Sequence, residues 1–128
     1  MIEVEFILYV SEQERSKNFY QKLLQIEPSL DVPGMTEFNL PGCKLGLMPE
    51  NGISKILQQK TKPPELGTGI PRCEIYLKVP DAISFHQRGI ELGAKEISPA
   101  EIRSWGDLVS YLMDKDGHII AFAQSNHQ

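Results

Sequence analysis

Two glutamates at matching places in the chain are the residues best suited to chemistry. Glu5 opens the run Glu5–Val10, and Glu74 opens the run Glu74–Val79. Each run reads as an alternating apolar strand with one buried face. A carboxylate that faces the inside of a sheet needs a partner, because burying an unpaired charge is costly. We therefore expect Glu5 and Glu74 to lie at equivalent positions, on the same face of two equivalent strands.

Three interpretations of Glu5 and Glu74 remain open. The first is structural, with each carboxylate paired to Lys44, Lys78 or an arginine. The second is recognition of a cationic or hydrogen-bond-donating ligand. The third is acid–base catalysis or metal coordination, although two carboxylates without histidine partners make a weak transition-metal site. We expect all three histidines to be surface or local structural residues: His86, His118 and His127.

Aromatic and thioether side chains near these strands could form an apolar wall. Trp105, the only tryptophan, falls in a long predicted loop, where it either caps the core or lines a ligand site. Tyr9 and Tyr76 share the faces of the glutamates by strand parity. Phe38 and Met48 could add to the wall, with core packing as the alternative for both. The predicted ligand-binding residues are Glu5, Tyr9, Phe38, Met48, Glu74, Tyr76 and Trp105.

The first half of the chain predicts a strand, a helix, two strands and a short helix. A capping box places the N-cap of the first helix at Ser11, and the helix should end near Gln25. Pro49–Gly52 is expected to form a turn. The expected strands and second helix cover residues 4–10, 35–40, 44–48 and 53–60.

The second half repeats this order after a segment rich in proline and glycine. Asp81 is the expected N-cap of its helix and Gly93 the stop. The turn signal Asp114–Gly117 joins the last two strands into a hairpin. The expected strands, helix and loop cover residues 73–79, 82–92, 94–97, 98–106, 108–113 and 118–124.

The two halves predict one α+β domain made of two βαβββ modules. The modules are expected at residues 1–60 and 72–128, with a linker at 61–71. Each module can bury only one sheet face under its helix. Two copies side by side would form a curved, cup-like mixed sheet with the helices on the outside.

Composition excludes several classes of protein. The chain has 128 residues and a net charge of −4, which argues against a nucleic-acid binder. No apolar run approaches the roughly 20 residues needed to span a membrane. Two cysteines, Cys43 and Cys73, without a secretory segment favour reduced thiols in the cytoplasm.

The paired repeat resembles the vicinal oxygen chelate superfamily, which includes glyoxalase I, bleomycin-resistance proteins and extradiol dioxygenases. The likeness covers nearly the whole chain. Its most specific part runs from Trp105-Gly106 through Tyr111 to the terminal hairpin turn Asp114–His118, where Lys115 replaces a proline that is common in the family. The resemblance implies the cup of two βαβββ modules and a homodimer.

The resemblance also implies where a metal would be held. The four ligand positions of the metal enzymes fall on Glu5, Gly46, Glu74 and Ala121. Gly46 and Ala121 cannot ligate through side chains, which argues against a glyoxalase I site or an iron dioxygenase site. No cofactor is therefore expected, and a divalent metal held by the two glutamates is the lesser alternative.

The leading hypothesis is a metal-independent member of this superfamily that binds a small organic, cationic molecule in the cup. The first rival is a lyase, isomerase or dioxygenase-type enzyme that uses Glu5 or Glu74 as base or partial metal ligand. The second rival is a scaffold with a vestigial cup and only a dimer-forming role. The sequence does not name the ligand.

Overall fold

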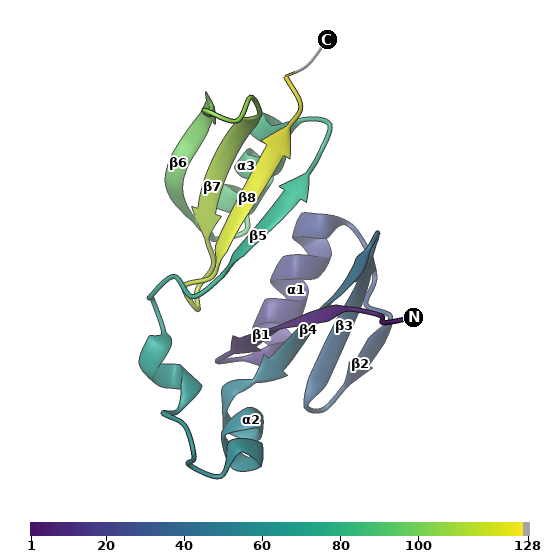
Figure 1. The fold of residues 1–128 in the computed structure, drawn as a ribbon, viewed down its shortest axis with the longest axis vertical. Coiled ribbons are helices and arrows are strands. Elements are labelled where there is room, and N and C mark those ends of the chain that lie inside the picture. Colours follow the sequence, from purple (N-terminus) through teal and green to yellow (C-terminus); the bar gives the residue numbers. More distant parts are fainter. Residues whose placement is uncertain (127–128) are drawn as a thin grey trace. The chain divides into compact units, whose positions relative to one another are not determined.

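The computed structural model describes residues 1–126, so the predicted tail residue His127 lies outside the described part. The chain divides into two compact units, Met1–Leu66 and Gly67–Gln128. Each unit contains a strand, a helix and three further strands in that order (Figure 1). The predicted α+β class and the two βαβββ modules are confirmed. No helix in the described residues is long and apolar enough to cross a membrane.

The first unit is a four-stranded mixed sheet with helices α1 and α2 in contact with its strands. Its elements are β1 (Glu5–Val10), α1 (Gln13–Leu24), β2 (Leu30–Val32), β3 (Met35–Leu40), β4 (Cys43–Pro49) and α2 (Glu50–Leu57). The strand order is β1-β4-β3-β2, with β1 parallel to β4 and the remaining pairs antiparallel. Edge strand β1 is therefore paired on one side only.

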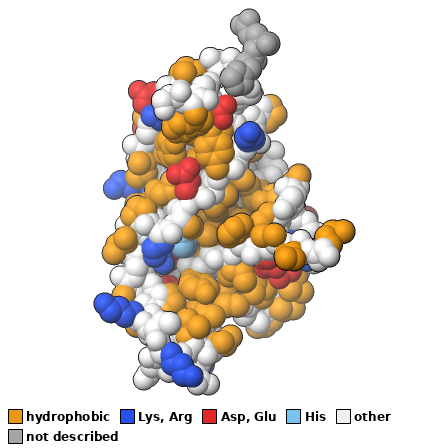
Figure 2. Space-filling model, viewed as in Figure 1, with side chains coloured by type: hydrophobic (Ala, Val, Ile, Leu, Met, Phe, Trp, Pro, Cys, Tyr) orange, Lys and Arg blue, Asp and Glu red, His pale blue; other side chains and the backbone are white. Residues whose placement is uncertain are grey.

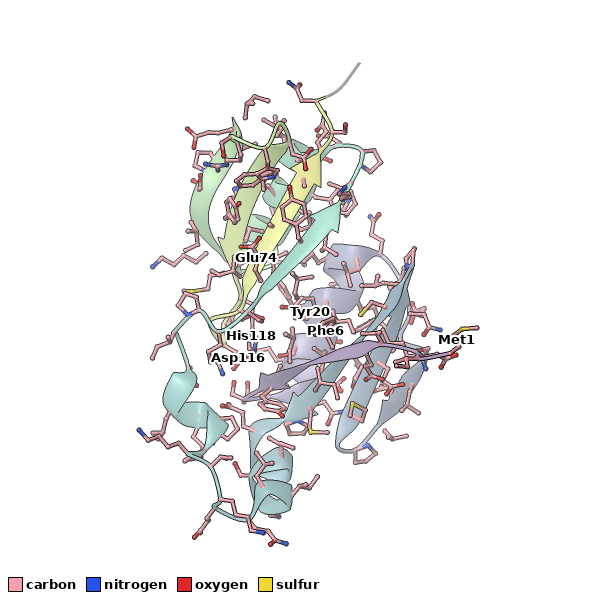
Figure 3. The ribbon with its side chains drawn as sticks, viewed as in Figure 1. Met1, Phe6, Tyr20, Glu74, Asp116 and His118 are labelled. Atoms are coloured by element: carbon pink, nitrogen blue, oxygen red, sulfur yellow. The ribbon has the colours of Figure 1, made fainter. Side chains whose placement is uncertain are left out.

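The core of the first unit lies between α1 and one face of its sheet. Ser16, Tyr20 and Leu23 are the buried residues of α1, and their spacing places them on one helix face. Figure 3 labels Tyr20 on this helix and Phe6 on β1. The sheet contributes alternate residues to the core, with exposed fractions of 0 to 4%: Leu8, Val10, Phe38, Leu45 and Leu47.

The second unit repeats this construction. A short 3₁₀ helix, η1 (Pro64–Gly67), crosses the boundary between the units. It is followed by β5 (Glu74–Lys78), α3 (Ala82–Glu91), β6 (Lys95–Ile102), β7 (Leu108–Met113) and β8 (Ile119–Gln124). The strand order is β5-β8-β7-β6, with β5 parallel to β8, so each sheet has the same topology.

Helix α3 covers one face of the second sheet. Its N-cap is Asp81 as predicted, because the Asp81 carboxylate accepts a hydrogen bond from the backbone N–H of Ser84 at 3.2 Å. Phe85 packs against Phe122 of β8 with ring centroids 5.4 Å apart. His86 is buried, and its Nε2 lies 2.7 Å from a carboxylate oxygen of Glu96.

Several local predictions are wrong. The N-cap of α1 is Glu12 rather than Ser11, whose hydroxyl accepts a hydrogen bond from Arg15 instead. Helix α2 begins at Glu50, inside the predicted turn Pro49–Gly52; it packs on β4 and β1 and buries Glu50 and Ile53.

Two strands were also mispredicted. The short strand β2 was missed, since its three residues are all exposed and carry no burial pattern. Strand β6 continues through Pro99 to Ile102, where the sequence predicts a loop. Register shifts against β7 on both sides of Ser98 accommodate the proline.

Candidate functional site

The face of the first sheet opposite α1 carries the predicted site residues of that unit. Glu5, Ile7 and Tyr9 alternate along β1 with Phe6, Leu8 and Val10, of which Leu8 and Val10 are buried. Register pairs them with Lys44, Gly46 and Met48 of β4. These six residues share the open face, as strand parity predicts. Phe38, however, has the opposite parity and is completely buried under α1, so it belongs to the core and not to a ligand wall.

Glu5 bends over the backbone of Gly46. A Cβ atom at position 46 would lie 2.5 Å from Oε2 of Glu5 and 3.1 Å from Cγ1 of Ile7. The missing side chain of Gly46 thus makes room for the carboxyl group of Glu5. Oε2 of Glu5 is buried and has no hydrogen-bond partner among residues 1–126.

A second carboxyl group lies beside Glu5. Glu37 of β3 is opposite Gly46 in the strand register, and its carboxylate is 3.8 Å from Nζ of Lys44. Burial raises the pKa of Glu5, a side-chain hydrogen bond with Glu37 and the charge of that carboxylate raise it further, and the charge of Lys44 lowers it. The open face therefore holds a carboxyl group that keeps its proton to a higher pH than a free glutamate does.

The equivalent face of the second unit is covered by aromatic rings. Ala121 of β8 lies between Tyr76 of β5 and Tyr111 of β7 in the strand register. Both tyrosines pack on a small apolar cluster that is at most 1% exposed: Val109, Ala121 and Ala123. The rings of Tyr76 and Tyr111 therefore cover Ala121 from the two neighbouring strands.

A chain of two hydrogen bonds joins the aromatic residues to an acid. Trp105 Nε1 donates to the Tyr76 hydroxyl at 2.7 Å, and that hydroxyl donates to Asp107 Oδ2 at 2.7 Å. Burial raises the pKa of Tyr76; the hydrogen bond from Trp105 lowers it and the Asp107 carboxylate raises it. The structure thus brings the predicted residues Tyr76 and Trp105 together. Trp105 remains 54% exposed.

Arg103 holds the loop that carries Trp105. Its guanidinium donates to the carbonyl of Val109 at 3.0 Å and to the hydroxyl of Ser98 at 2.7 Å. It also lies 5.1 Å from the centre of the Tyr111 ring, within cation–π distance. One side chain therefore ties β6, β7 and the aromatic surface to each other.

Glu74 has a different environment from Glu5. It is exposed at the start of β5, where Figure 3 labels it. At the other end of β5, a hollow of about 390 Å³ is lined by Lys78, Val79, Pro80, Asp107, Ala123 and Ser125. No ion pair joins Lys78 to Asp107 among the residues described. Both charges face this hollow.

Two residues of the candidate site, Glu37 and Asp107, were not predicted from the sequence. Glu37 was missed, although parity along residues 35–40 puts it on the open face, opposite to Phe38. Asp107 was missed because its role depends on the Tyr76 hydroxyl, 31 positions away in the chain. Only a contact between distant strands reveals such a residue.

Cys73 and His118 form a further polar pair in the second unit. The thiol lies 3.5 Å from Nδ1 of His118, which is 3% exposed and is labelled in Figure 3. Burial raises the pKa of the Cys73 thiol; the charge of Asp114 raises it and that of Arg72 lowers it. Because the thiolate is disfavoured, this pair is poorly suited to nucleophilic chemistry.

Two of the four positions at which the family resemblance predicts metal ligands, Gly46 and Ala121, offer no side-chain ligand to a metal ion. Gly46 has no side chain, and the space beside it is filled by the Glu5 carboxyl group. Ala121 is fully buried beneath two tyrosines. Among the described residues, no three histidine, cysteine, aspartate or glutamate side chains are grouped closely enough to bind one.

The visible strand surface of each unit is mostly hydrophobic, with a few charged side chains (Figure 2). Such a surface is typical of sites for small organic molecules, where a few polar groups orient the ligand.

The sequence and the fold match one family. The model for the Glyoxalase/Bleomycin resistance protein/Dioxygenase superfamily matches residues 4–122. A search of curated protein sequences gives no significant match.

Several solved structures share the fold at low sequence identity. A glyoxalase-related enzyme from Fulvimarina pelagi is 20% identical, with a TM-score of 0.82 over 97% of this chain and 88% of that one. A glyoxalase/bleomycin resistance protein/dioxygenase family enzyme from Burkholderia phytofirmans PsJN is 12% identical, with a TM-score of 0.78 over 94% and 95%. A glyoxalase/bleomycin resistance protein/dioxygenase from Nocardioides is 17% identical, with a TM-score of 0.74 over 100% and 89%.

Proposed function

We propose that this chain, which belongs to the Glyoxalase/Bleomycin resistance protein/Dioxygenase superfamily, binds a small organic cation on the open faces of its sheets without a standard metal site. The observation that carries the proposal is the Glu5 carboxyl group. Its Oε2 atom is buried on the open face without a hydrogen-bond donor. A ligand with a positive charge or a donor group would satisfy this oxygen.

The surroundings of the two glutamates support the same ligand class. Glu5 has Tyr9 and Met48 on its own sheet face. Glu74 shares its face with Tyr76, which is joined to Trp105. Aromatic rings beside carboxylates favour flat cations, because the ring faces and the acids attract positive charge together.

Paired probes of opposite charge test this proposal. We expect the planar cation N-methylacridinium to quench the fluorescence of Trp105 and to bind more tightly than acridine-9-carboxylate. The combined substitution Glu5→Gln and Glu74→Gln should weaken binding of the cation by about fivefold or more, since each removes one carboxylate. Isothermal titration calorimetry gives the dissociation constants.

Glu91→Gln provides the matched control, because Glu91 is an exposed acid at the end of α3, which covers the other face of its sheet. It should leave the affinity unchanged. Unchanged binding in the double variant, or equal binding of the anionic probe, would refute a recognition role for the two acids.

A second candidate is an enzyme of the same superfamily that uses Glu5 as general acid or base. The raised pKa of Glu5 favours it, because a carboxyl group poised closer to neutral pH transfers protons more effectively. This candidate predicts turnover that Glu5→Gln abolishes while binding is retained. A hemithioacetal isomerisation assay is expected to be negative, since the glyoxalase I ligand set is incomplete.

We further propose that the protein forms a homodimer in the cytoplasm. Edge strand β1 has one unpaired side, and Phe6 on it is 68% exposed, which supports association through this strand. Both cysteines, Cys43 and Cys73, are free thiols, which fits a reducing compartment.

A further inference from the structure

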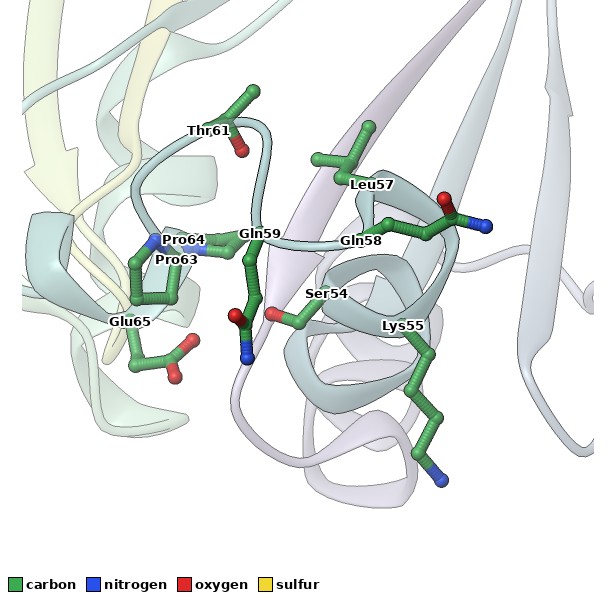
Figure 4. A pocket seen from close by; sticks show the side chains of 9 residues that line it. All are labelled: Ser54, Lys55, Leu57, Gln58, Gln59, Thr61, Pro63, Pro64 and Glu65. Atoms are coloured by element: carbon green, nitrogen blue, oxygen red, sulfur yellow. The ribbon is translucent and has the colours of Figure 1, made fainter.

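A hollow of about 800 Å³ lies in the first unit, between α2 and the segment that follows it. It is lined by Ser54, Lys55, Leu57, Gln58, Gln59, Thr61, Pro63, Pro64 and Glu65 (Figure 4). All nine residues lie within one continuous stretch of chain. None of them belongs to the open sheet face, so the hollow is separate from the site proposed above.

Two consecutive glutamines shape this hollow. Gln58 has a φ angle of 53° and Gln59 one of 62°, both in the left-handed region that residues with a side chain rarely adopt. The backbone N–H of Gln58 caps α2 by donating to the carbonyl of Ser54. The second left-handed residue is not needed for that cap. It turns the chain so that the Gln59 side chain faces the hollow, and such strained residues are found most often at binding sites.

Three polar side chains converge on the hollow from different parts of the segment. Figure 4 shows the hydroxyl of Ser54, the amide of Gln59 and the carboxylate of Glu65 projecting into the same space. The Ser54 hydroxyl oxygen is buried, and no described residue forms a hydrogen bond with it. An unsatisfied buried hydroxyl is costly in a folded protein, and a ligand that supplies the missing hydrogen bond removes this cost.

These polar groups favour a ligand that donates hydrogen bonds. Glu65 offers only acceptor atoms, while Ser54 and Gln59 can each accept as well as donate. Glu65 has no ion-pair partner among the described residues. Lys55, the cation on the rim, extends away from the three polar groups in Figure 4. An anionic ligand would therefore be repelled by the Glu65 carboxylate.

The remaining wall is apolar and of suitable size. Leu57, Pro63 and Pro64 present hydrocarbon surface beside the polar groups. The volume lies within the range of about 300–1,000 Å³ found for small-molecule sites. The prolines fix their own backbone angles, so this wall loses little conformational freedom when a ligand binds.

We propose that this hollow is a second binding site, which accepts a small apolar ring carrying an amide, amidine or amine donor group. The donor group contacts Ser54, Gln59 and Glu65, and the ring lies against Leu57 and the two prolines. Occupation of this site does not require the open sheet faces.

Three nearly isosteric probes test the proposal: benzamidine, benzamide and benzoate, which differ mainly in charge. In ¹⁵N-resolved NMR titrations of the full chain, we expect benzamidine and benzamide to shift the backbone signals of residues 54–65. These probes are small, so dissociation constants of about 1 mM are expected. Benzoate should produce no saturable shifts in this segment. Benzoate binding as tight as that of benzamidine, or shifts confined to the strands, would overturn the proposal.

Two left-handed glutamines supply a matched pair of variants. Gln59→Ala removes an amide that faces the hollow, whereas Gln25→Ala removes one at the C-cap of α1, outside the hollow. Both substitutions occur at left-handed backbone positions, so their cost to folding is comparable. Gln59→Ala should weaken benzamide binding by about fivefold, and Gln25→Ala should leave it unchanged. Equal effects of the two substitutions would contradict the proposed contact.

Ser54→Ala and Glu65→Gln distinguish the contribution of the Ser54 hydroxyl to binding from that of the Glu65 carboxylate. Ser54→Ala should weaken benzamidine and benzamide alike. Glu65→Gln should weaken benzamidine more than benzamide, because only the cation loses an ion pair. An amide spectrum that retains the wild-type pattern elsewhere shows that each variant is folded. Retained affinity for both probes in both variants would exclude this site.

Discussion

At Gly46 the missing side chain does more than remove a possible metal ligand. It gives the Glu5 carboxyl group a place on the sheet, where Glu5 meets Glu37 and comes under the influence of Lys44. The conformation of Glu5 therefore depends on the absence of a side chain at position 46. A side chain at position 46 and the present position of the Glu5 carboxyl group exclude each other.

Gly46→Ala tests this relation. The new Cβ would lie 2.5 Å from Oε2 of Glu5, so the carboxyl group must move. Because Oε2 is the end of a flexible side chain, we expect a loss of about 1 kcal/mol in the free energy of unfolding, measured by urea denaturation. The double variant with Glu5→Ala should recover part of that loss. Gly52→Ala is the control, because a Cβ there meets nothing within 4 Å. Additive effects of Gly46→Ala and Glu5→Ala would show that the two positions are independent.

The raised pKa of Glu5 predicts a pH-dependent gain in stability from Glu5→Gln. Below the ordinary glutamate pKa of 4.5, both the folded and the unfolded protein carry the proton. As the pH rises through the raised folded pKa, the folded state loses stability because ionisation is easier in the unfolded chain. The urea midpoint of Glu5→Gln relative to wild type should therefore increase between about pH 4 and pH 8.

Glu74→Gln is the matched control for that measurement, since Glu74 occupies the equivalent position of β5 but is exposed. A gain of the same size and pH dependence at Glu74 would argue against burial as the cause.

Among the elements, the segment between β6 and β7 makes the largest difference between the two open faces. It supplies Trp105, which hydrogen-bonds to Tyr76, and Arg103, which holds β6 against β7. The first unit has only the short turn Pro33–Gly34 between β2 and β3 at the equivalent place. The first open face is therefore acidic and uncovered by such a segment, whereas the second is lined with aromatic rings.

Tyr76→Phe should release Trp105 from this surface. The hydroxyl accepts one hydrogen bond and donates another, so its removal leaves both Trp105 and Asp107 without this partner. We expect a loss of about 1–2 kcal/mol in stability and stronger quenching of tryptophan fluorescence by acrylamide. Trp105 is the only tryptophan, so its fluorescence can be followed directly.

Tyr111→Phe is the control for Tyr76→Phe, because the Tyr111 ring also packs on the apolar cluster while its hydroxyl makes no hydrogen bond to any residue in the described part of the chain. Quenching should stay at the wild-type level in this variant. Unchanged quenching in Tyr76→Phe would show that the loop holds Trp105 by other contacts.

At the scale of the whole molecule, the proposed dimer is expected to form through edge strand β1. Edge strands with exposed hydrophobic side chains are prone to pairing. Sedimentation equilibrium should give twice the 14.4 kDa mass of one chain. Phe6→Lys should shift the population toward monomer, since a charged residue on an edge strand opposes pairing.

Ile83→Lys is the matched control, because Ile83 is similarly exposed, at 62%, but lies on α3. A monomer mass for the wild type would contradict the dimer. Equal dissociation in both variants would place the interface elsewhere.

The sequence by itself determined the repeat, the two modules and the faces of most strands. Alternation along β1 and β5 was sufficient for this, because side-chain direction in a strand follows chain position directly. The positions of Glu5, Tyr9 and Met48 on one face were predictable for the same reason. Parity also identifies Phe38 as a core residue once β3 and β4 are paired.

Only the tertiary structure decided what surrounds each of these residues. The approach of Glu5 to Glu37 depends on the register of β1, β4 and β3. The hydrogen bonds from Trp105 through Tyr76 to Asp107 join positions about 30 residues apart. The chain's pattern records which way a side chain points, but pairing between strands determines its neighbours, and neighbours set charge, burial and pKa.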